Sequence, residues 1–155
     1  NALIDALVAA YPPPRYYADP EQMRDSIRRG IMFNIIDTSR GDKADLVPLT
    51  MEPRYLFAFQ HRIRQIVELP TTEPFEIWCA RPEDVIVGKL MAWAEGRSRK
   101  HETDIHQMLL FDTVQRATSN LDISYIEQQA QELGEDVHRF WRMVLESATA
   151  AGAES

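Results

Sequence analysis

The sequence has few of the features that mark secreted or membrane-spanning proteins. Its 155 residues include a single cysteine, Cys79, which excludes an internal disulfide and is typical of a reducing cytoplasm. No apolar run reaches the length of a membrane span, and no signal peptide is recognisable. These absences predict a cytoplasmic protein without a membrane partner. Because the chain begins with Asn1-Ala2 and not with methionine, we expect a tag remnant or further residues upstream.

Positive charge is also scarce. The chain has 17 lysines and arginines against 24 aspartates and glutamates, a formal net charge of −7. Non-specific binding to nucleic acids depends on neutralising phosphates with basic side chains, so we predict no strong binding of that kind. A local basic pocket for one nucleotide is still compatible with this composition, because the basic residues cluster at Arg24/Arg28/Arg29, at Arg62/Arg64 and at Arg97/Arg99/Lys100.

Long polar runs and glycine are scarce as well, which argues against a disordered chain. Hydrophobic residues make up 45% of the sequence, enough to bury one core. We therefore predict a single domain over residues 1–147. The small side chains of residues 148–155 bury too little surface to offset the entropy of ordering, and this segment is predicted to be a disordered tail.

The order of the hydrophobic patterns predicts an α+β fold whose C-terminal half is helical. Residues 33–49 and 64–79 should each form an antiparallel strand pair, and both pairs should belong to one sheet. Four helices should follow residue 81, and those at 123–133 and 135–148 should cover one face of the sheet. The other expected elements are a helix over 3–10, a short strand at 15–18, a helix from Asp19 to Gly30, and a weakly helical segment over 53–61.

Asp45 is a carboxylate within an apolar strand pattern. In a strand over residues 43–49 it shares a face with Val47 and Leu49. An ionised carboxylate on an apolar face is costly unless a cation, a metal or a hydrogen-bond donor meets it. The pattern alone favours the simpler interpretation, in which Asp45 lies at a strand end in solvent or pairs with Lys43 or an arginine.

Two further charged residues lie beside apolar helix stripes. Lys89 is one turn from Val85 and from Trp93, where a lysine either extends its ammonium group to water or binds a phosphate. Asp104 is one turn before Met108. Its spacing alone favours a role as a partner of the helix dipole.

The chain resembles a group of bacterial nucleotidyltransferase-fold proteins, relatives of minimal and abortive-infection toxin nucleotidyltransferases. The resemblance covers residues 11–141, and its specificity comes from the order of the motifs, since each motif alone is short. The motifs are Phe33-Asn34-Ile35-Ile36, Lys43-Ala44-Asp45-Leu46-Val47-Pro48-Leu49, Pro82-Glu83-Asp84-Val85-Ile86 with Lys89-Leu90, and a basic turn before Asp104-Ile105.

This resemblance implies a nucleotidyltransferase-like mixed or antiparallel sheet and metal-dependent transfer of a nucleotide from a nucleoside triphosphate; it does not specify the acceptor. Asp45 would be a catalytic carboxylate that binds Mg²⁺. Lys89 would lie near the phosphates and Asp104 would open the following helix, with Arg97 and Arg99 as substrate-binding residues in the basic turn. We expect Asp45, Lys89 and Asp104 to converge on one concavity.

The chain departs from the family pattern in two places. The Gly-Ser turn and the Asp-x-Asp pair of the family precede everything present here, and the sequence contains no Gly-Ser followed by Asp-x-Asp. One carboxylate is a poor Mg²⁺ site because hard cations take several oxygen ligands, so we predict no transfer by these 155 residues alone. In addition, Arg81 replaces the small capping residue expected before Pro82-Glu83-Asp84, whose two acids complement the helix dipole.

Other function classes have less or equal support in the sequence. A restriction-type nuclease could take its acids from Asp45 and Glu76, but Trp78 occupies the position of the required lysine. A HEPN-type ribonuclease pairs an arginine and a histidine on one helix, as Arg99 and His106 could, but that fold is all-helical.

The main alternative is a non-catalytic interaction module or a toxin–antitoxin component that retains the fold. Exposed strand edges would favour a homo-oligomer.

Overall fold

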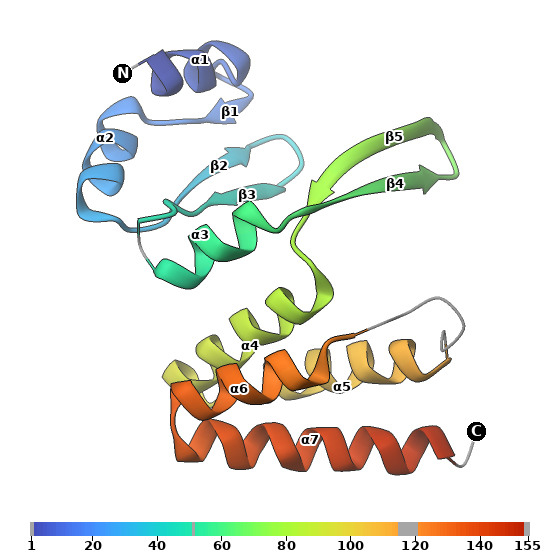
Figure 1. Ribbon diagram of the computed structural model, residues 1–155. Coiled ribbons are helices and arrows are strands. Elements are labelled where there is room, and N and C mark those ends of the chain that lie inside the picture. The colour runs from blue at the N-terminus through green and yellow to red at the C-terminus, as the bar shows by residue number, and fades with distance from the viewer. Residues whose placement is uncertain (1, 51, 115–120, 154–155) are drawn as a thin grey trace. The chain divides into compact units, whose positions relative to one another are not determined.

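The computed structural model describes residues 2–50, 52–114 and 121–153, without the side chains of residues 113 and 114 (Figure 1). The chain divides into two compact units, residues 1–60 and 61–155, whereas the sequence predicts a single domain over residues 1–147. Each unit has its own buried hydrophobic cluster. Hydrophobic patterns locate the apolar residues of each element, but they do not tell which elements share a core.

The first unit combines helices with a three-stranded antiparallel sheet in the order β1-β2-β3. The predicted hairpin is present, with Ile35 of β2 opposite Ala44 of β3, but β3 ends at Leu46 and not at Leu49. The elements of this unit are α1 (Ala2–Ala10), β1 (Tyr16–Tyr17), α2 (Pro20–Arg29), β2 (Phe33–Asp37), β3 (Lys43–Leu46) and α3 (Pro53–Gln60).

Helix α2 begins and ends where the sequence predicts. The Asp19 carboxylate accepts hydrogen bonds from the backbone N–H groups of Glu21 (2.8 Å) and Gln22 (3.0 Å), which have no partner within the helix. At the other end Gly30 has a φ of 65°, in the left-handed region that glycine adopts at low cost. The two caps explain why this polar segment forms a helix between fixed ends.

A small core lies between the sheet and its helices. Ile4 of α1, Met23 of α2, and Phe33 and Ile35 of β2 are buried there. Along β2 the buried residues alternate with half-buried ones, as expected for side chains that point to opposite faces of a strand. The third buried side chain on this face is a carboxylate, Asp37.

The second unit starts with an antiparallel hairpin, again as the sequence predicts. The prediction of one sheet for both strand pairs is wrong, because β4 and β5 form a two-stranded sheet of their own within the described residues. Local turns specify the pairing inside each hairpin but not the pairing between hairpins. The elements of this unit are β4 (Ile63–Leu69), β5 (Thr72–Cys79), α4 (Pro82–Gly96), α5 (Arg99–Val114), α6 (Ile123–Leu133) and α7 (Glu135–Ala153).

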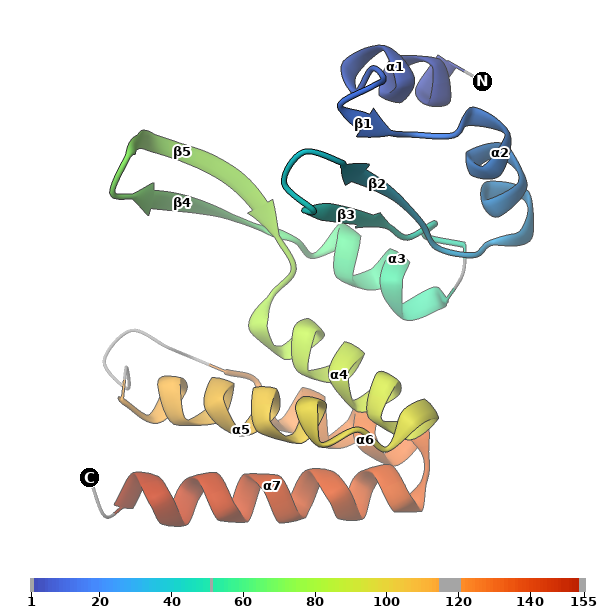
Figure 2. The ribbon, with the colours of Figure 1, turned by 180° about the vertical axis from the view of Figure 1, so that it is seen from behind.

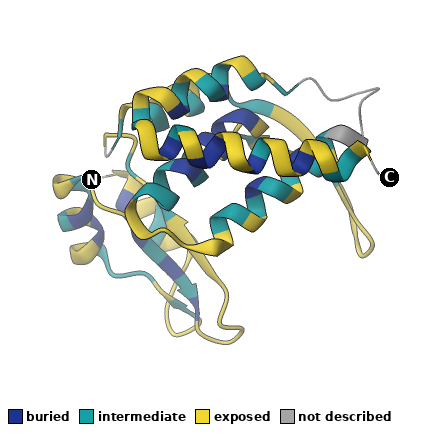
Figure 3. Cartoon of the chain, turned by 90° about the horizontal axis from the view of Figure 1, so that it is seen from below, coloured by how far each residue is buried: buried dark blue, intermediate teal, exposed yellow. Residues whose placement is uncertain are grey.

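The four predicted helices after residue 81 form one helical group, in which α5 and α7 lie side by side (Figures 1 and 2). Buried and exposed residues alternate along each helix of the group (Figure 3). The sequence predicts that α6 and α7 cover a sheet face; their apolar residues instead share one cluster with those of α4 and α5. The fully buried members of this cluster include Ile86, Leu90, Ile105, Ile126 and Trp141.

Helix α7 continues to Ala153, whereas the sequence predicts a disordered tail from Ala148. Ala148 is only 1% exposed because it packs on the helical cluster, and alanine is the best helix former, so the small residues continue the helix. Residues 154 and 155 lie outside the described part. None of the helices in the described ranges combines the length and the apolar composition that a membrane crossing requires.

Candidate functional site

Asp45 lies on β3, opposite Asn34 of β2. Its side chain is 38% exposed, and its Oδ1 lies 3.3 Å from the Nζ of Lys43, which is 57% exposed. Because β3 ends at Leu46, the apolar strand face that Asp45 was expected to share with Val47 and Leu49 does not form. The geometry matches the simpler interpretation, an exposed carboxylate at the strand end that pairs with Lys43.

A divalent-metal site is not complete around Asp45. Within the described ranges, no three histidine, cysteine, aspartate or glutamate side chains are grouped so that they could hold a metal ion. Asp45 offers two oxygens, whereas Mg²⁺ requires near-octahedral coordination by about six. The described residues therefore do not fit the Mg²⁺ that the resemblance implies, unless further ligands come from elsewhere.

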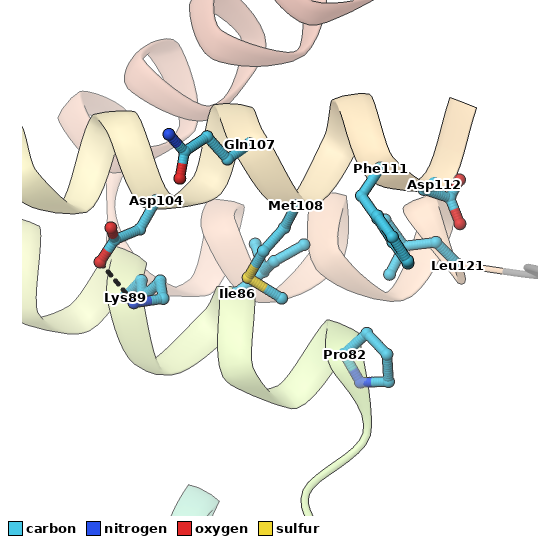
Figure 4. Close-up of a pocket in the computed structure, with 9 residues that line it drawn as sticks. All are labelled: Pro82, Ile86, Lys89, Asp104, Gln107, Met108, Phe111, Asp112 and Leu121. Atoms are coloured by element: carbon cyan, nitrogen blue, oxygen red, sulfur yellow. Dashed lines mark hydrogen bonds and ion pairs between the residues drawn. The ribbon is translucent and has the colours of Figure 1, made fainter. Parts of the chain in front are cut away.

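Lys89 and Asp104 are brought together by the packing of α4 against α5 (Figure 4). The Nζ of Lys89 lies 2.7 Å from the Oδ2 of Asp104, although the two residues are 15 positions apart in the sequence. Their side chains are 26% and 29% exposed, respectively, so the pair is half-buried but still reachable from solvent. Two of the three residues that the resemblance predicts to converge therefore meet.

The electrostatic surroundings keep Asp104 ionised. The hydrogen bond from Lys89 lowers the pKa of Asp104 below the ordinary value of 3.8, and the charges of Lys89, Lys100 and His101 act in the same direction. Partial desolvation opposes these effects without cancelling them. Asp104 is thus an anion at neutral pH, and it holds the Lys89 ammonium group in a defined position.

This pKa shift predicts a pH-dependent stability. A depressed folded-state pKa contributes stability that is present above the unfolded-state pKa and is lost as the pH falls through the folded-state pKa. Asp104→Asn should therefore lower the free energy of unfolding most at pH 7, and the difference from the wild type should shrink below about pH 4. Urea unfolding followed by circular dichroism at several pH values measures this. Glu146→Gln, on an exposed position of α7, is the control, and a difference for Asp104→Asn that does not change with pH would contradict the assignment.

The Lys89–Asp104 pair stands at one end of a cavity of about 510 Å³ that is lined by α4 and α5 (Figure 4). Ile86, Met108 and Phe111 provide apolar walls. Asp112 lies toward the opposite end from the ion pair (Figure 4). An apolar cleft with a few convergent charged groups is the usual form of a small-molecule site.

The two arginines predicted to bind substrate differ in their surroundings. The guanidinium group of Arg97 lies 4.2 Å from the ring centre of Trp93, and its Nη2 donates to Asp136 at 3.3 Å. These contacts connect the end of α4 to the start of α7. Arg99 is the first residue of α5 and is exposed, and its side chain has no hydrogen-bond or ion-pair partner within the described residues. Of the two, only Arg99 has a side chain that is free for an anion.

The sequence did not reveal a buried ionic network at the start of α4. Arg81 donates to both carboxylate oxygens of Asp84, from Nε at 2.8 Å and from Nη2 at 3.1 Å, and the Tyr125 hydroxyl donates to Oδ1 at 3.0 Å. The hydrogen bond with Asp84 raises the pKa of Arg81. The spacing of three residues between Arg81 and Asp84 was the available signal. From the sequence, Arg81 is predicted to weaken the helix cap and the two following acids to complement the helix dipole, and Tyr125 has no sequence signal.

A second polar network joins α6 to α7. Glu127 accepts a hydrogen bond from the buried indole N–H of Trp141 at 2.8 Å, and one of its carboxylate oxygens lies 2.7 Å from the Nε2 of His138. The His138 contact and the Trp141 hydrogen bond lower the pKa of Glu127 against the effect of desolvation. The first network holds the start of α4, which lines the cavity, and the second joins α6 to α7; no residue of either network lines the cavity.

Comparisons with known proteins give no match. No family model, no curated protein and no solved structure matches the chain. The resemblance therefore rests on the sequence motifs alone. Asp45 belongs to the first unit and the Lys89–Asp104 pair to the second, and each is described within its own unit. The convergence of Asp45 with the other two residues stays a prediction.

Proposed function

We propose that this chain is part of a nucleotidyltransferase-like protein, in which Lys89 and Asp104 form part of the nucleotide-binding site and Asp45 is one of the metal-binding carboxylates. The observation that carries the proposal is the Lys89–Asp104 ion pair at 2.7 Å on the wall of a cavity. The motif resemblance predicts that these residues share a site, and helical spacing alone gives no reason for a contact across 15 positions.

The chemistry of the cavity supports a phosphorylated ligand with a flat apolar part. A lysine ammonium group is a compact positive charge suited to phosphate oxygens. Asp104 orients that group, and the half-exposed position leaves room for an anion to approach. The walls at Ile86, Met108 and Phe111 are suited to the flat ring of a nucleobase.

The exposure of Asp45 also agrees with this role. Its ion pair with Lys43 lies on the surface, where such pairs contribute roughly 0–1 kcal/mol. Asp45 can therefore leave Lys43 for a metal ion at little cost. We propose that the other carboxylates of that metal site come from residues outside this sequence, since the described residues do not complete it.

The 155-residue chain alone is expected to show weak or absent ATP binding and no nucleotide transfer. Catalysis of this kind depends on accurately placed charges, and Asp45 alone cannot place a metal ion. The measurements are calorimetry with ATP and Mg²⁺, and a label-transfer assay with each of the four nucleoside triphosphates. The comparison is a longer protein that includes any upstream residues encoded by the gene. If those residues contain Gly-Ser and Asp-x-Asp, the longer protein should bind ATP with Mg²⁺ and transfer a nucleotide.

Two outcomes would contradict the proposal. One is transfer by the 155-residue chain that Asp45→Ala abolishes, because the chain would then be complete by itself. The other is a longer protein that has the upstream motif and yet binds no nucleotide.

A non-catalytic interaction module is the second candidate, and the β4–β5 hairpin favours it. Ile66 and Trp78 are large, exposed apolar residues on its strands. The guanidinium groups of Arg62 and Arg64 lie 4.7 and 4.8 Å from the ring centre of Trp78. Aromatic and arginine side chains are enriched at protein interfaces. A gene that encodes no upstream Gly-Ser and Asp-x-Asp would favour this function over nucleotide transfer.

A further inference from the structure

The first unit contains a second cavity, of about 400 Å³, beside its three-stranded sheet. Ile35 and Asp37 of β2 and Ala44 and Leu46 of β3 line it. Strand side chains alternate between faces, and Asp45 lies between two of these residues, so its side chain projects from the opposite face. Asp45 does not line the cavity, although Lys43, its ion-pair partner, does.

An arginine is held rigidly at this cavity. The Nε and Nη2 of Arg15 donate to the same oxygen of Asp37, Oδ2, at 3.1 and 3.0 Å. The other oxygen of Asp37 accepts from the backbone N–H of Ser39 at 3.0 Å and from its hydroxyl at 2.6 Å. Asp37 is buried and its two oxygens are both occupied, so it is not available to a ligand.

The charge of Asp37 is permanent at neutral pH. Hydrogen bonds from Ser39, followed by those from Arg15, lower the pKa of Asp37 to about 2 despite its burial. The Arg15 side chain is 57% exposed, and its Nη1 takes no part in the bonds to Asp37. One edge of the guanidinium group is thus fixed while another edge is open to solvent. A donor that is already ordered loses little entropy when it binds an anion.

The rest of the cavity is suited to an aromatic ring. Tyr11 and Tyr16 pack edge to face with ring centres 5.2 Å apart, and the Arg15 guanidinium lies 5.0 Å from the ring centre of Tyr16. Leu7 and Ile35 add apolar surface from α1 and β2. The lining also contains the charged residues Arg40, Asp42 and Lys43. Apolar and aromatic walls with a few placed polar groups are the usual composition of a site for a small molecule.

We propose that this cavity binds a small aromatic carboxylate, whose carboxylate group contacts Arg15 and whose ring packs against Tyr11, Tyr16 and the apolar lining. A cationic ligand is disfavoured because the Asp37 oxygens are occupied and Asp42 pairs with Arg40 at 2.9 Å. The open edge of a guanidinium group matches a planar carboxylate, with which arginine forms paired hydrogen bonds. The proposal does not depend on nucleotide transfer, since none of Asp45, Lys89 and Asp104 lines this cavity.

The test is a titration of the 155-residue chain with naphthalene-2-carboxylate. Calorimetry and NMR chemical shifts measure the binding. Naphthalene-2-carboxamide, which has the same shape without the charge, is the matched control ligand. We expect the carboxylate to bind with a dissociation constant of roughly 1 mM or lower, as expected for a ligand of this size. It should bind at least about tenfold more tightly than the carboxamide, because hydrogen bonds to charged groups are the stronger kind.

Two substitutions test whether the ligands bind in this cavity. Arg15→Gln should weaken carboxylate binding about tenfold or more and leave carboxamide binding unchanged. Ala44→Phe should fill the cavity and weaken both ligands without touching the Arg15–Asp37 pair, so it remains informative if Arg15→Gln fails to fold. Arg24→Gln, an exposed α2 residue that is outside the cavity lining and pairs with Asp5, should change neither ligand. Equal binding of carboxylate and carboxamide, or unchanged binding in Ala44→Phe, would overturn the proposal. The Arg15–Asp37 pair would then only connect the residue before β1 to the end of β2.

Discussion

Replacing Asp84 with alanine should lower the free energy of unfolding by about 3 kcal/mol, because it removes one partner of a buried ion pair. The Asp84 side chain is 2% exposed and accepts hydrogen bonds from Arg81 and from Tyr125. Without Asp84 the Arg81 guanidinium still has the longer ion pair with Glu83, at 3.4 Å, and the ring of Tyr125, whose centre is 5.3 Å away. The expected loss is at the lower end of the usual range because Glu83 remains.

Urea unfolding at pH 7, followed by circular dichroism, measures this loss. Asp84→Asn keeps the shape of the side chain and an acceptor for Tyr125, so it should be less destabilising than alanine. Asp25→Ala is the matched control, since Asp25 forms exposed ion pairs with Arg28 and Arg29 on α2 and should contribute less than about 1 kcal/mol. A loss at Asp84→Ala no larger than at Asp25→Ala would show that the buried pair contributes nothing to stability.

This network also bears on the proposed nucleotide site. Arg81 and Asp84 fix the first turn of α4, and Tyr125 connects that turn to α6. Two turns further along the same helix, Lys89 meets Asp104. We therefore expect substitutions at Asp84 to weaken nucleotide binding by the longer protein as well, through the position of α4 and not through contact with the ligand.

Local features of the sequence predicted the ends of several elements. Asp19 and Gly30 bound α2, and the Asp122 side chain accepts a hydrogen bond from the backbone N–H of Tyr125 at the start of α6, as capping chemistry predicts. The two hairpins also form as predicted, because their turns and strand patterns are local. These predictions succeed because the interacting groups are only a few residues apart in the chain.

Features that depend on contacts between distant segments were not predicted. Asp37 is buried because Arg15 and Ser39 satisfy its oxygens, and Arg15 is 22 positions away. The separation into two sheets and the helical state of residues 148–153 likewise depend on which elements pack against each other in the folded chain. The resemblance predicts that Lys89 and Asp104 face one concavity, but neither it nor the helical spacing predicts the direct ion pair between them.

The largest effect on activity is expected from Asp45→Ala in a longer protein that has the Gly-Ser and Asp-x-Asp segment. Nucleotide transfer should fall on the order of a hundredfold or more, since changes to residues that only support a metal ligand already cost about 10–100-fold. The label-transfer assay with Mg²⁺ and the preferred nucleoside triphosphate measures this. Asp25→Ala, which removes an exposed carboxylate on α2, should leave transfer unchanged.

A stability measurement on the same variant separates catalysis from folding. Asp45 is exposed and its one ion pair is with Lys43, so Asp45→Ala should change the free energy of unfolding by less than about 1 kcal/mol. Lys43→Gln removes the same ion pair by replacing the lysine, and this variant should keep most of the nucleotide-transfer activity. Loss of transfer in Asp45→Ala, together with unchanged stability and an active Lys43→Gln, would assign the carboxylate to metal binding. Equal transfer in all three proteins would instead make Asp45 the exposed partner of Lys43 and favour an interaction module built on the same fold.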